Sequence, residues 1–179
     1  MKLKMKNGSL EYATKEDVER LANWWADGRV MEHAGFPKGL RTNKENLAKR
    51  LEKQAIDSVL WMIKDSQQHP IGEMNHTIKD GVATLGIKIC DLKSQNKGMG
   101  KTALKTLIRY LFQTFKIDRM WLDTMIENKR AQHVYQSLHF KQTKINKAHW
   151  KDQLGNMRTS VEFELSRKTF LRNEGFFND

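Results

Sequence analysis

Residues 94–105 read SQNKGMGKTALK, and they lie directly before the most regular apolar pattern in the chain. Glycines at the start of a helix let unpaired backbone N–H groups come close to a phosphate. The stretch therefore predicts a phosphate-binding turn followed by a long amphipathic helix. The apolar positions of that helix are Met99, Ala103, Leu104, Leu107, Ile108, Leu111, Phe112 and Phe115.

Three known glycine motifs compete for this turn. A Walker A loop needs a glycine five positions before Gly100, and Gln95 stands there, so this motif is excluded. The dinucleotide fingerprint G-x-G-x-x-G/A fits residues 98–103, but a polar stretch separates it from the preceding apolar run, which ends at Cys90. The third motif, Q/R-x-x-G-x-G/A, is matched by Gln95, Gly98 and Gly100. The remainder of the chain has to decide between the last two.

The bulk composition is that of a water-soluble protein with one domain, which we expect to span residues 1–179. The chain is 39% hydrophobic and 30% charged, and no apolar run approaches the ~20 residues of a membrane helix. The basic first residues lack the apolar segment of a secretory signal. The single cysteine, Cys90, excludes an internal disulfide. We therefore expect a cytoplasmic protein with no membrane contact.

The formal net charge of +11 favours anionic partners. Nucleic acid, the ribosome and a phosphorylated cofactor all qualify, and a solvated lysine-rich surface explains the charge as well. The lysines and arginines are scattered along the chain instead of forming one block. No metal site is predicted, because the histidines at positions 33, 69, 76, 133, 139 and 149 have no metal-ligand spacing.

The periodic patterns predict a mixed α+β chain. Capping boxes at Thr14-x-x-Asp17 and Thr42-x-x-Glu45 indicate two early helix starts, and Asp80-Gly81 indicates a tight hairpin turn. Strands are expected at residues 10–13, 59–64, 71–78, 82–90, 119–126, 140–150 and 157–166, and helices after the two capping boxes, from residue 98 and at 128–138.

This order of elements and three local motifs resemble the GNAT N-acetyltransferase superfamily. The first motif is LGIKIC at residues 85–90, followed by QNKGMGKTAL. The second is MWLDTMIENKRAQHVYQSLHF at residues 120–140, and the third is HWKDQLGNMRTSVEFEL at residues 149–165. Together they span roughly residues 58–166, and they look most like the branch of ribosomal-protein alanine acetyltransferases and spermidine acetyltransferases.

The resemblance implies a fold and a co-substrate. The fold is a central, mostly antiparallel twisted sheet of six to seven strands, splayed at a cofactor cleft, with about four helices. The co-substrate is acetyl-CoA, whose pantetheine arm would pair with the backbone of Ile87, Ile89 and Cys90. Its pyrophosphate would lie on residues Gln95, Asn96, Lys97, Gly98, Met99, Gly100 and Lys101.

The resemblance also gives roles to two residues of the second motif. Asn128 matches an asparagine that contacts the cofactor, although an asparagine here can equally be a helix N-cap. Tyr135 matches a tyrosine near the thioester sulfur, where its hydroxyl can protonate the departing thiolate. A buried tyrosine with a structural role is the alternative for Tyr135.

The sequence departs from the family pattern at two positions. His139 replaces the glycine of Leu-Gly-Phe, so it must adopt a turn that favours glycine. Thr84 stands where many relatives carry a glutamate that acts as a base. Glu73 is the first candidate to replace that base, and His76 or a water chain is the alternative. Because their spacing is odd, Glu73 and His76 should point to opposite faces of their strand.

The expected function is transfer of the acetyl group from acetyl-CoA directly to a primary amine, either a protein N-terminus or a small molecule. Trp25 and Phe36 are candidates for the acceptor cleft, although such residues are more often core. The positive charge suits an association with the ribosome or a ribosomal protein, and an exposed final hairpin could pair two copies in a homodimer. A non-catalytic module that binds acyl-CoA or RNA on the same fold is the alternative.

Overall fold

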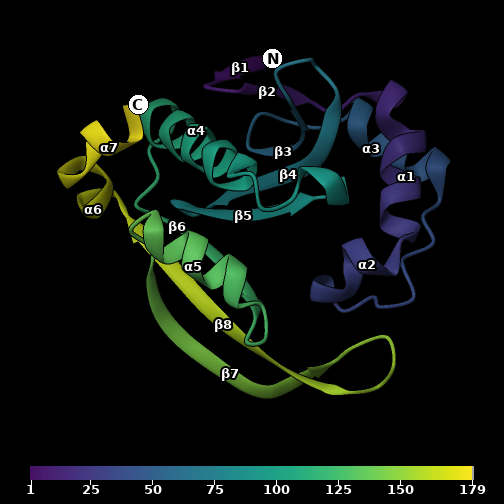
Figure 1. Cartoon of the computed structure of the whole chain (residues 1–179). Helices are drawn as coiled ribbons and strands as arrows, with labels where there is room; N and C mark the ends of the chain where they lie inside the picture. The colour runs from purple at the N-terminus through teal and green to yellow at the C-terminus, as the bar shows by residue number, and fades with distance from the viewer. Residues whose placement is uncertain (179) are drawn as a thin grey trace. The chain divides into compact units, whose positions relative to one another are not determined.

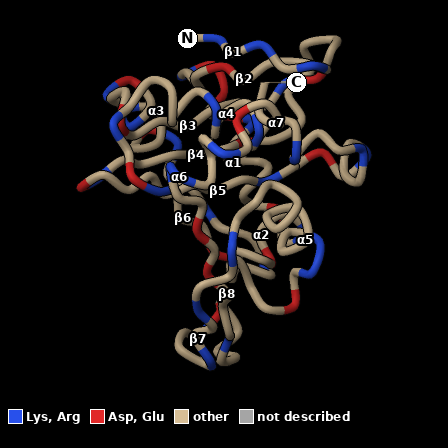
Figure 2. The backbone as a smooth tube through the Cα atoms, turned by 90° about the vertical axis from the view of Figure 1, so that its left-hand side faces the viewer, with Lys and Arg blue, Asp and Glu red and all other residues tan. Residues whose placement is uncertain are grey.

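The computed structural model describes residues 1–178, and its contacts divide the chain into two compact units (Figure 1). The first unit contains Met1–Ala13, Ala55–Trp121 and the chain from Glu164 onward. The second contains Thr14–Gln54 and Leu122–Phe163. The expectation of one domain over residues 1–179 stays a prediction. Lysine and arginine occur along the whole chain, as the composition indicated (Figure 2).

The mixed α+β class is confirmed, but the expected numbers of strands and helices were too low. Residues 1–178 contain an eight-stranded sheet with the order β1-β2-β3-β4-β5-β6-β8-β7, and seven α-helices. The strands are β1 Lys2–Met5, β2 Gly8–Tyr12, β3 Ser58–Lys64, β4 Pro70–Lys79, β5 Val82–Ile89, β6 Arg119–Met125, β7 Lys141–Lys151 and β8 Met157–Ser166.

The additional elements are short, which is why periodicity did not reveal them. Strand β1 has only four residues, and the helices α2 Gly28–Met31, α6 Arg167–Arg172 and α7 Glu174–Asn178 each cover less than two turns. The longer helices are α1 Val18–Ala26, α3 Lys44–Glu52, α4 Met99–Thr114 and α5 Lys129–Ser137. No helix in the described part of the chain combines the length and apolar character that a membrane crossing requires.

In the first unit, β1 to β5 form an antiparallel meander. Asp80 and Gly81 join β4 to β5 with φ of 49° and 75°, the left-handed turn that the sequence predicted. Strand β6 then pairs with β5 in parallel, but this ladder covers only Val82–Thr84 of β5. Strand β5 continues beyond the ladder to Ile89.

Helix α4 packs on one face of this meander. The ring centroid of Trp61 on β3 lies 5.9 Å from that of Tyr110 on α4, and the Gly100 position faces Ile87 and Ile89 on β5. The aromatic C-terminal segment packs against the same helix, because Phe170 stacks on Phe112 at 4.5 Å. Phe177, in the same segment, is 1% exposed.

Arg167 joins the end of α4 to the C-terminal segment. Its guanidinium donates to the carbonyls of Ile117, Phe112 and Phe115 at 2.7, 3.0 and 2.6 Å. These bonds satisfy carbonyls at a helix end that would otherwise lack partners.

In the second unit, side chains cap both expected helix starts, but at the second start the capping residue differs from the expected one. Thr14 and Asp17 form the predicted capping box. At the second site the N-cap of α3 is Asn43, whose side chain accepts from the N–H of Asn46 at 2.9 Å, so the expectation for Thr42 was wrong by one residue. Asparagine is among the strongest N-caps, and it outcompetes the neighbouring threonine here.

Candidate functional site

The predicted phosphate turn is a tight loop between β5 and α4 in the first unit. Asp91 starts it as the cap of a 3₁₀ turn, accepting from the N–H of Lys93 and from the hydroxyl of Ser94. Asn96 and Gly98 then adopt φ of 61° and 77°, and α4 begins at Met99. No side chain caps the helix at Gly98. The first N–H groups of α4 therefore point out of the loop without an intrahelical acceptor.

The two glycines have no packing partner inside the chain that would require them. A Cβ at Gly98 would meet nothing within 4 Å, and a Cβ at Gly100 would lie at an ordinary 3.6–3.9 Å from Ile87 and Ile89. Gly98 is explained by its positive φ, but Gly100 is helical, where glycine costs roughly 0.5–1 kcal/mol relative to alanine. A ligand that needs the backbone at close range explains a glycine at position 100.

The loop is tied to the end of β5 by Gln95. Its Nε2 donates to the carbonyl of Ile89 at 2.9 Å. Lys97 is exposed, while the ammonium of Lys101 lies 5.7 Å from the ring centroid of Phe176. The Met99 side chain is buried, so Met99 can offer only its backbone to a ligand. The loop thus combines outward N–H groups with two cations, a suitable environment for a diphosphate.

Cys90 differs from Ile87 and Ile89 as a candidate for the pantetheine arm. The N–H of Cys90 donates to the carbonyl of Ile71 at 2.9 Å, so it is already used within the unit. Burial, followed by the negative charge of Glu73, raises the pKa of the Cys90 thiol. A buried thiol of this kind is unreactive. No three His, Cys, Asp or Glu side chains gather into a metal-binding group in residues 1–178.

Glu73, the candidate base, forms an ion pair across β4 and β5. Its carboxylate is 1% exposed, and its Oε1 lies 2.9 Å from the Nζ of Lys88. The β4–β5 register places Glu73 opposite Lys88 and Thr77 opposite Thr84. Thr84 therefore shares its face of the sheet with Glu73.

His76 is excluded as a base by its hydrogen bonds. Its Nδ1 accepts from the indole N–H of Trp61 at 3.0 Å, so the proton is on Nε2, which lies 3.0 Å from the carbonyl of Ile56. Burial lowers the pKa of His76, which favours this neutral form. Both ring nitrogens are thus used inside the first unit, on the face opposite to Glu73, as the spacing predicted.

In the second unit, Asn128 is the N-cap of α5. Its Oδ1 accepts from the N–H of Ala131 at 3.2 Å, and its Nδ2 donates to Thr124 at 3.0 Å. The N–H of Asn128 donates to the carbonyl of Met125 at 2.9 Å. The capping interpretation is confirmed, and the cofactor contact stays a prediction.

Tyr135 lies on the inner face of α5 and is 6% exposed. Its ring packs edge-on against Phe163 with centroids 5.5 Å apart. Burial, and then the carboxylate of Asp123, raise the pKa of the Tyr135 phenol. No group in the described part of the chain forms a hydrogen bond with its hydroxyl. The phenol is therefore protonated at neutral pH, as a proton donor must be, but its raised pKa makes it a weaker acid than an exposed tyrosine.

Asp123, which interacts electrostatically with Tyr135, was not among the site residues expected from the sequence. It is exposed on β6, and partial desolvation by its surroundings, followed by the negative charge of Glu162 on β8, raises the pKa of its carboxyl. Glu162 is in turn held by the Nδ2 of Asn146 at 2.6 Å. The only signal in the sequence was an aspartate within the apolar run MWLDTM.

Trp25 and Phe36, the candidates for the acceptor cleft, are both half-exposed. The carbonyl of Trp25 accepts from the N–H of Leu40 at 2.6 Å, which fixes the segment that follows Phe36. The turn between β7 and β8 secures the same segment, because the side chain of Gln153 bonds to Lys38 and Gly39. The role of Trp25 and Phe36 in binding an acceptor stays a prediction.

Comparison with known proteins matches the chain to one family. A family model described as acetyltransferase (GNAT) domain matches residues 9–141. No curated protein sequence matches the chain.

Solved structures share the fold at low identity. The spermidine N-acetyltransferase from Vibrio cholerae in complex with CoA and spermine has 17% identity and a TM-score of 0.80, over 90% of this chain and 96% of that one. The ribosomal L7/L12 alpha-N-protein acetyltransferase in complex with coenzyme A has 14% identity and a TM-score of 0.81, over 94% and 99%. A GNAT-family acetyltransferase from Bacillus anthracis has 16% identity and a TM-score of 0.78, over 94% and 99%.

Proposed function

Because the chain belongs to the GNAT acetyltransferase family, we propose that it transfers the acetyl group of acetyl-CoA directly to a primary amine. Family membership gives the general class, an acyltransferase. The specific co-substrate, the direct transfer to nitrogen and the residues that carry it out are our proposal.

The glycine turn at the start of α4 is the observation that carries this proposal. Gly98 has φ of 77°, and alanine would fit at Gly100 without any clash inside the chain. The N–H groups that follow lack a capping side chain, and Lys97 and Lys101 supply positive charge. These features suit the diphosphate of coenzyme A, which the backbone would contact most closely at Gly100. On this proposal, the part of β5 beyond its ladder with β6 pairs with the pantetheine arm.

Two protons have to move in the reaction. A carbon–nitrogen bond forms while the carbon–sulfur bond of the thioester breaks, the amine loses a proton, and the departing sulfur gains one. We assign the donated proton to the hydroxyl of Tyr135, which is protonated at neutral pH, and its transfer requires the departing thiolate to offset the raised pKa of the phenol. The proton from the amine goes to Glu73, which shares a face with Thr84, or to Asp123.

The net charge of the chain bears on the acceptor. A polycation such as spermidine would be repelled by a protein of charge +11, whereas a protein N-terminus close to RNA would not. We therefore favour the N-terminus of a ribosomal protein as the acceptor, in line with one of the two kinds of similar structure.

A thermal-shift titration with acetyl-CoA, followed by an acetylation screen, tests the proposal. We expect stabilisation by acetyl-CoA and acetylation of N-terminal peptides of ribosomal proteins in preference to spermidine. An unchanged unfolding midpoint would refute the site. Stabilisation without transfer to any amine of the panel would show a binding module instead of an enzyme.

A further inference from the structure

A basic hollow lies in the first unit, where β1, α4 and α7 meet. It has a volume of about 490 Å³. Its charged lining consists of Lys4 and Lys6 from the first hairpin, and Lys105 and Arg109 from α4. No aspartate or glutamate lines it within residues 1–178. The hydroxyl-bearing residues Thr102 and Thr106 complete the α4 side.

The hollow adjoins the glycine turn along α4, because Thr102, which lines the hollow, follows Gly100 by two residues. The turn faces β5 through Gly100, whereas the hollow is bordered by β1 at the other end of the meander. Four strand spacings separate β1 from β5, or roughly 19 Å at about 4.8 Å per strand. A ligand held by Lys4 and Lys6 on the β1 side therefore extends away from the glycine turn.

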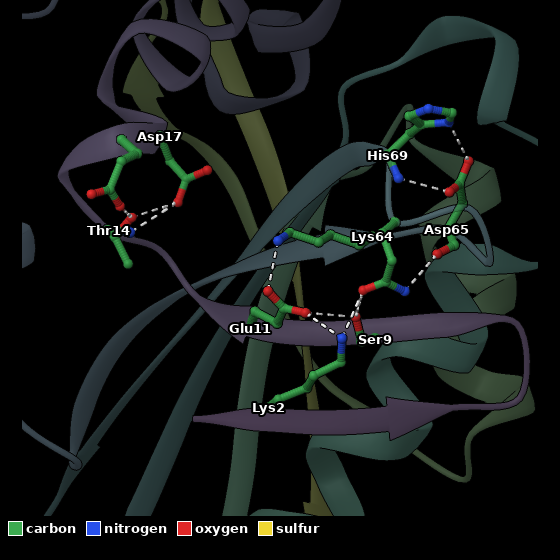
Figure 3. A network of polar contacts seen from close by, with 10 residues as sticks. Lys2, Ser9, Glu11, Thr14, Asp17, Lys64, Asp65 and His69 are labelled. Carbon is green, nitrogen blue, oxygen red and sulfur yellow. Dashed lines mark hydrogen bonds and ion pairs between the residues drawn. The ribbon is translucent and has the colours of Figure 1, made fainter.

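The four cations of the hollow have no acidic partners in residues 1–178, in contrast to Lys2 and Lys64 on the strands of the same unit. On the neighbouring strands, Lys2 and Lys64 bracket Glu11 at 2.7 and 2.6 Å (Figure 3). Within the described residues, no carboxylate forms an ion pair with any of the four cations of the hollow. Lys105 lies 4.5 Å from the ring centroid of Phe176, and Arg109 donates to the carbonyl of Asn178 at 3.4 Å.

The charge pattern on α4 costs stability when nothing binds it. Lys101, Lys105 and Arg109 follow each other at i,i+4 spacing. Like charges at this spacing destabilise a helix by about 0.2–0.5 kcal/mol per pair. An anion in the hollow would relieve the repulsion between Lys105 and Arg109, the two cations of α4 that line it.

The lining suits several phosphates in a row. Guanidinium, ammonium and hydroxyl groups are the donors that contact phosphate oxygens. One phosphate carries a charge of only about −1.5 to −2, so the four cations are matched better by a row of phosphates than by a single one. A flat membrane surface could not enter a concave site. We propose that the hollow lined by Lys4, Lys6, Lys105 and Arg109 binds the phosphate backbone of single-stranded RNA.

Binding of a fluorescent single-stranded RNA at several salt concentrations tests this inference. Each lost contact to a phosphate should reduce the slope of log K against log salt by about 0.7. Changing all four cations to glutamine should therefore reduce the magnitude of the slope of log K against log salt by roughly 3. Lys4→Gln with Lys6→Gln should lose about half as much, and it leaves the α4 contacts with the C-terminal segment intact.

The matched control changes four lysines of the exposed strand β7 to glutamine, namely Lys141, Lys144, Lys147 and Lys151. It removes the same charge, and we expect it to keep most of the wild-type slope. An equal loss in this control would show general charge attraction and overturn the proposal. Stronger binding of inorganic tripolyphosphate than of RNA would overturn it too, because the site would then select a small oligophosphate.

The acetyl-CoA thermal shift of the four-cation variant separates this inference from the proposed function. We expect that shift to be unchanged, and saturating acetyl-CoA should not displace the RNA. Competition between the two ligands would place the RNA in the coenzyme A site and refute a separate hollow.

Discussion

Replacing Gly100 by alanine should stabilise the ligand-free protein and weaken its binding of coenzyme A. The new Cβ would lie 3.6 Å from Ile89 Cγ1 and 3.7 Å from Ile87 Cδ1, both ordinary contacts. Alanine is favoured over glycine in the middle of a helix by roughly 0.5–1 kcal/mol, which is an upper bound for Gly100 in the first turn of α4. For a chain of this size, 1 kcal/mol raises the unfolding midpoint by about 2–4 °C. The ligand-free variant should therefore melt up to a few degrees higher than the wild type.

The same methyl group would stand where the backbone approaches the diphosphate. A tenfold loss of affinity corresponds to about 1.4 kcal/mol. At a coenzyme A concentration of about 100 times the wild-type Kd, the ligand stabilises the wild type by about 2.7 kcal/mol. It would stabilise a variant with a tenfold higher Kd by only about 1.4 kcal/mol. The ligand-induced shift should thus fall by half while the ligand-free midpoint rises.

Thermal unfolding with and without coenzyme A, together with calorimetric titration, measures both effects. Gly175→Ala is the matched control, because Gly175 lies in the first turn of α7 and its Cβ would meet nothing within 4 Å. We expect the control to keep the wild-type ligand shift. Wild-type affinity in Gly100→Ala would refute the close approach of the backbone to the ligand. A lower midpoint of the ligand-free variant would show that the alanine clashes and that our steric interpretation is wrong.

Three further predictions concern single side chains. Tyr135→Phe should lower kcat by about 10²-fold or more and leave the Kd for acetyl-CoA unchanged, because a positioned acid contributes this much; equal turnover would reject the acid role. Glu11 has its pKa lowered from 4.5 to about 2 by Lys2 and Lys64, so its stabilisation is full above about pH 4.5 and is lost as the pH falls toward 2. Since Glu11 is partly exposed, Glu11→Gln should cost about 1 kcal/mol at pH 7, and urea unfolding should show this difference shrinking in acid. Burial lowers the pKa of His76, so below about pH 6.5 the unfolded chain binds a proton that the folded chain excludes. The free energy of unfolding of the wild type should therefore decrease as the pH is lowered below about 6.5. An equally steep pH dependence in His76→Gln would contradict this.

The parts of the fold that the sequence predicted are those set by local chemistry. The turn at Asp80-Gly81 and the start of α4 at Gly98 both follow from positive φ, which few residue types adopt. His139, expected to take the place of a glycine, has φ of 64°, so the histidine accepts the strain at that helix end. The long apolar stripe of α4 likewise predicted the element that covers the meander.

The partners of buried polar groups could not be predicted, because they are distant in sequence. The bond from Trp61 to His76 and the ion pair from Lys88 to Glu73 each span 15 residues, and both depend on strand register. Sequence spacing assigned the faces of Glu73 and His76 correctly. It gave no means of knowing that one was held by an ammonium and the other by an indole.

The threonine at position 84 shows how these non-local contacts decide the chemistry. In the proposed reaction the hydroxyl of a threonine cannot take the proton of the acceptor amine, so another group has to do so. His76 is excluded because both of its ring nitrogens are bonded, which leaves the carboxylates of Glu73 and Asp123. Glu73 is held by Lys88, whereas the carboxyl of Asp123 has a raised pKa and is electrostatically coupled to Tyr135 within the same unit. A raised pKa makes a carboxylate a stronger proton acceptor, so Asp123, which is exposed on β6, is the second candidate base beside Glu73 in the proposed reaction.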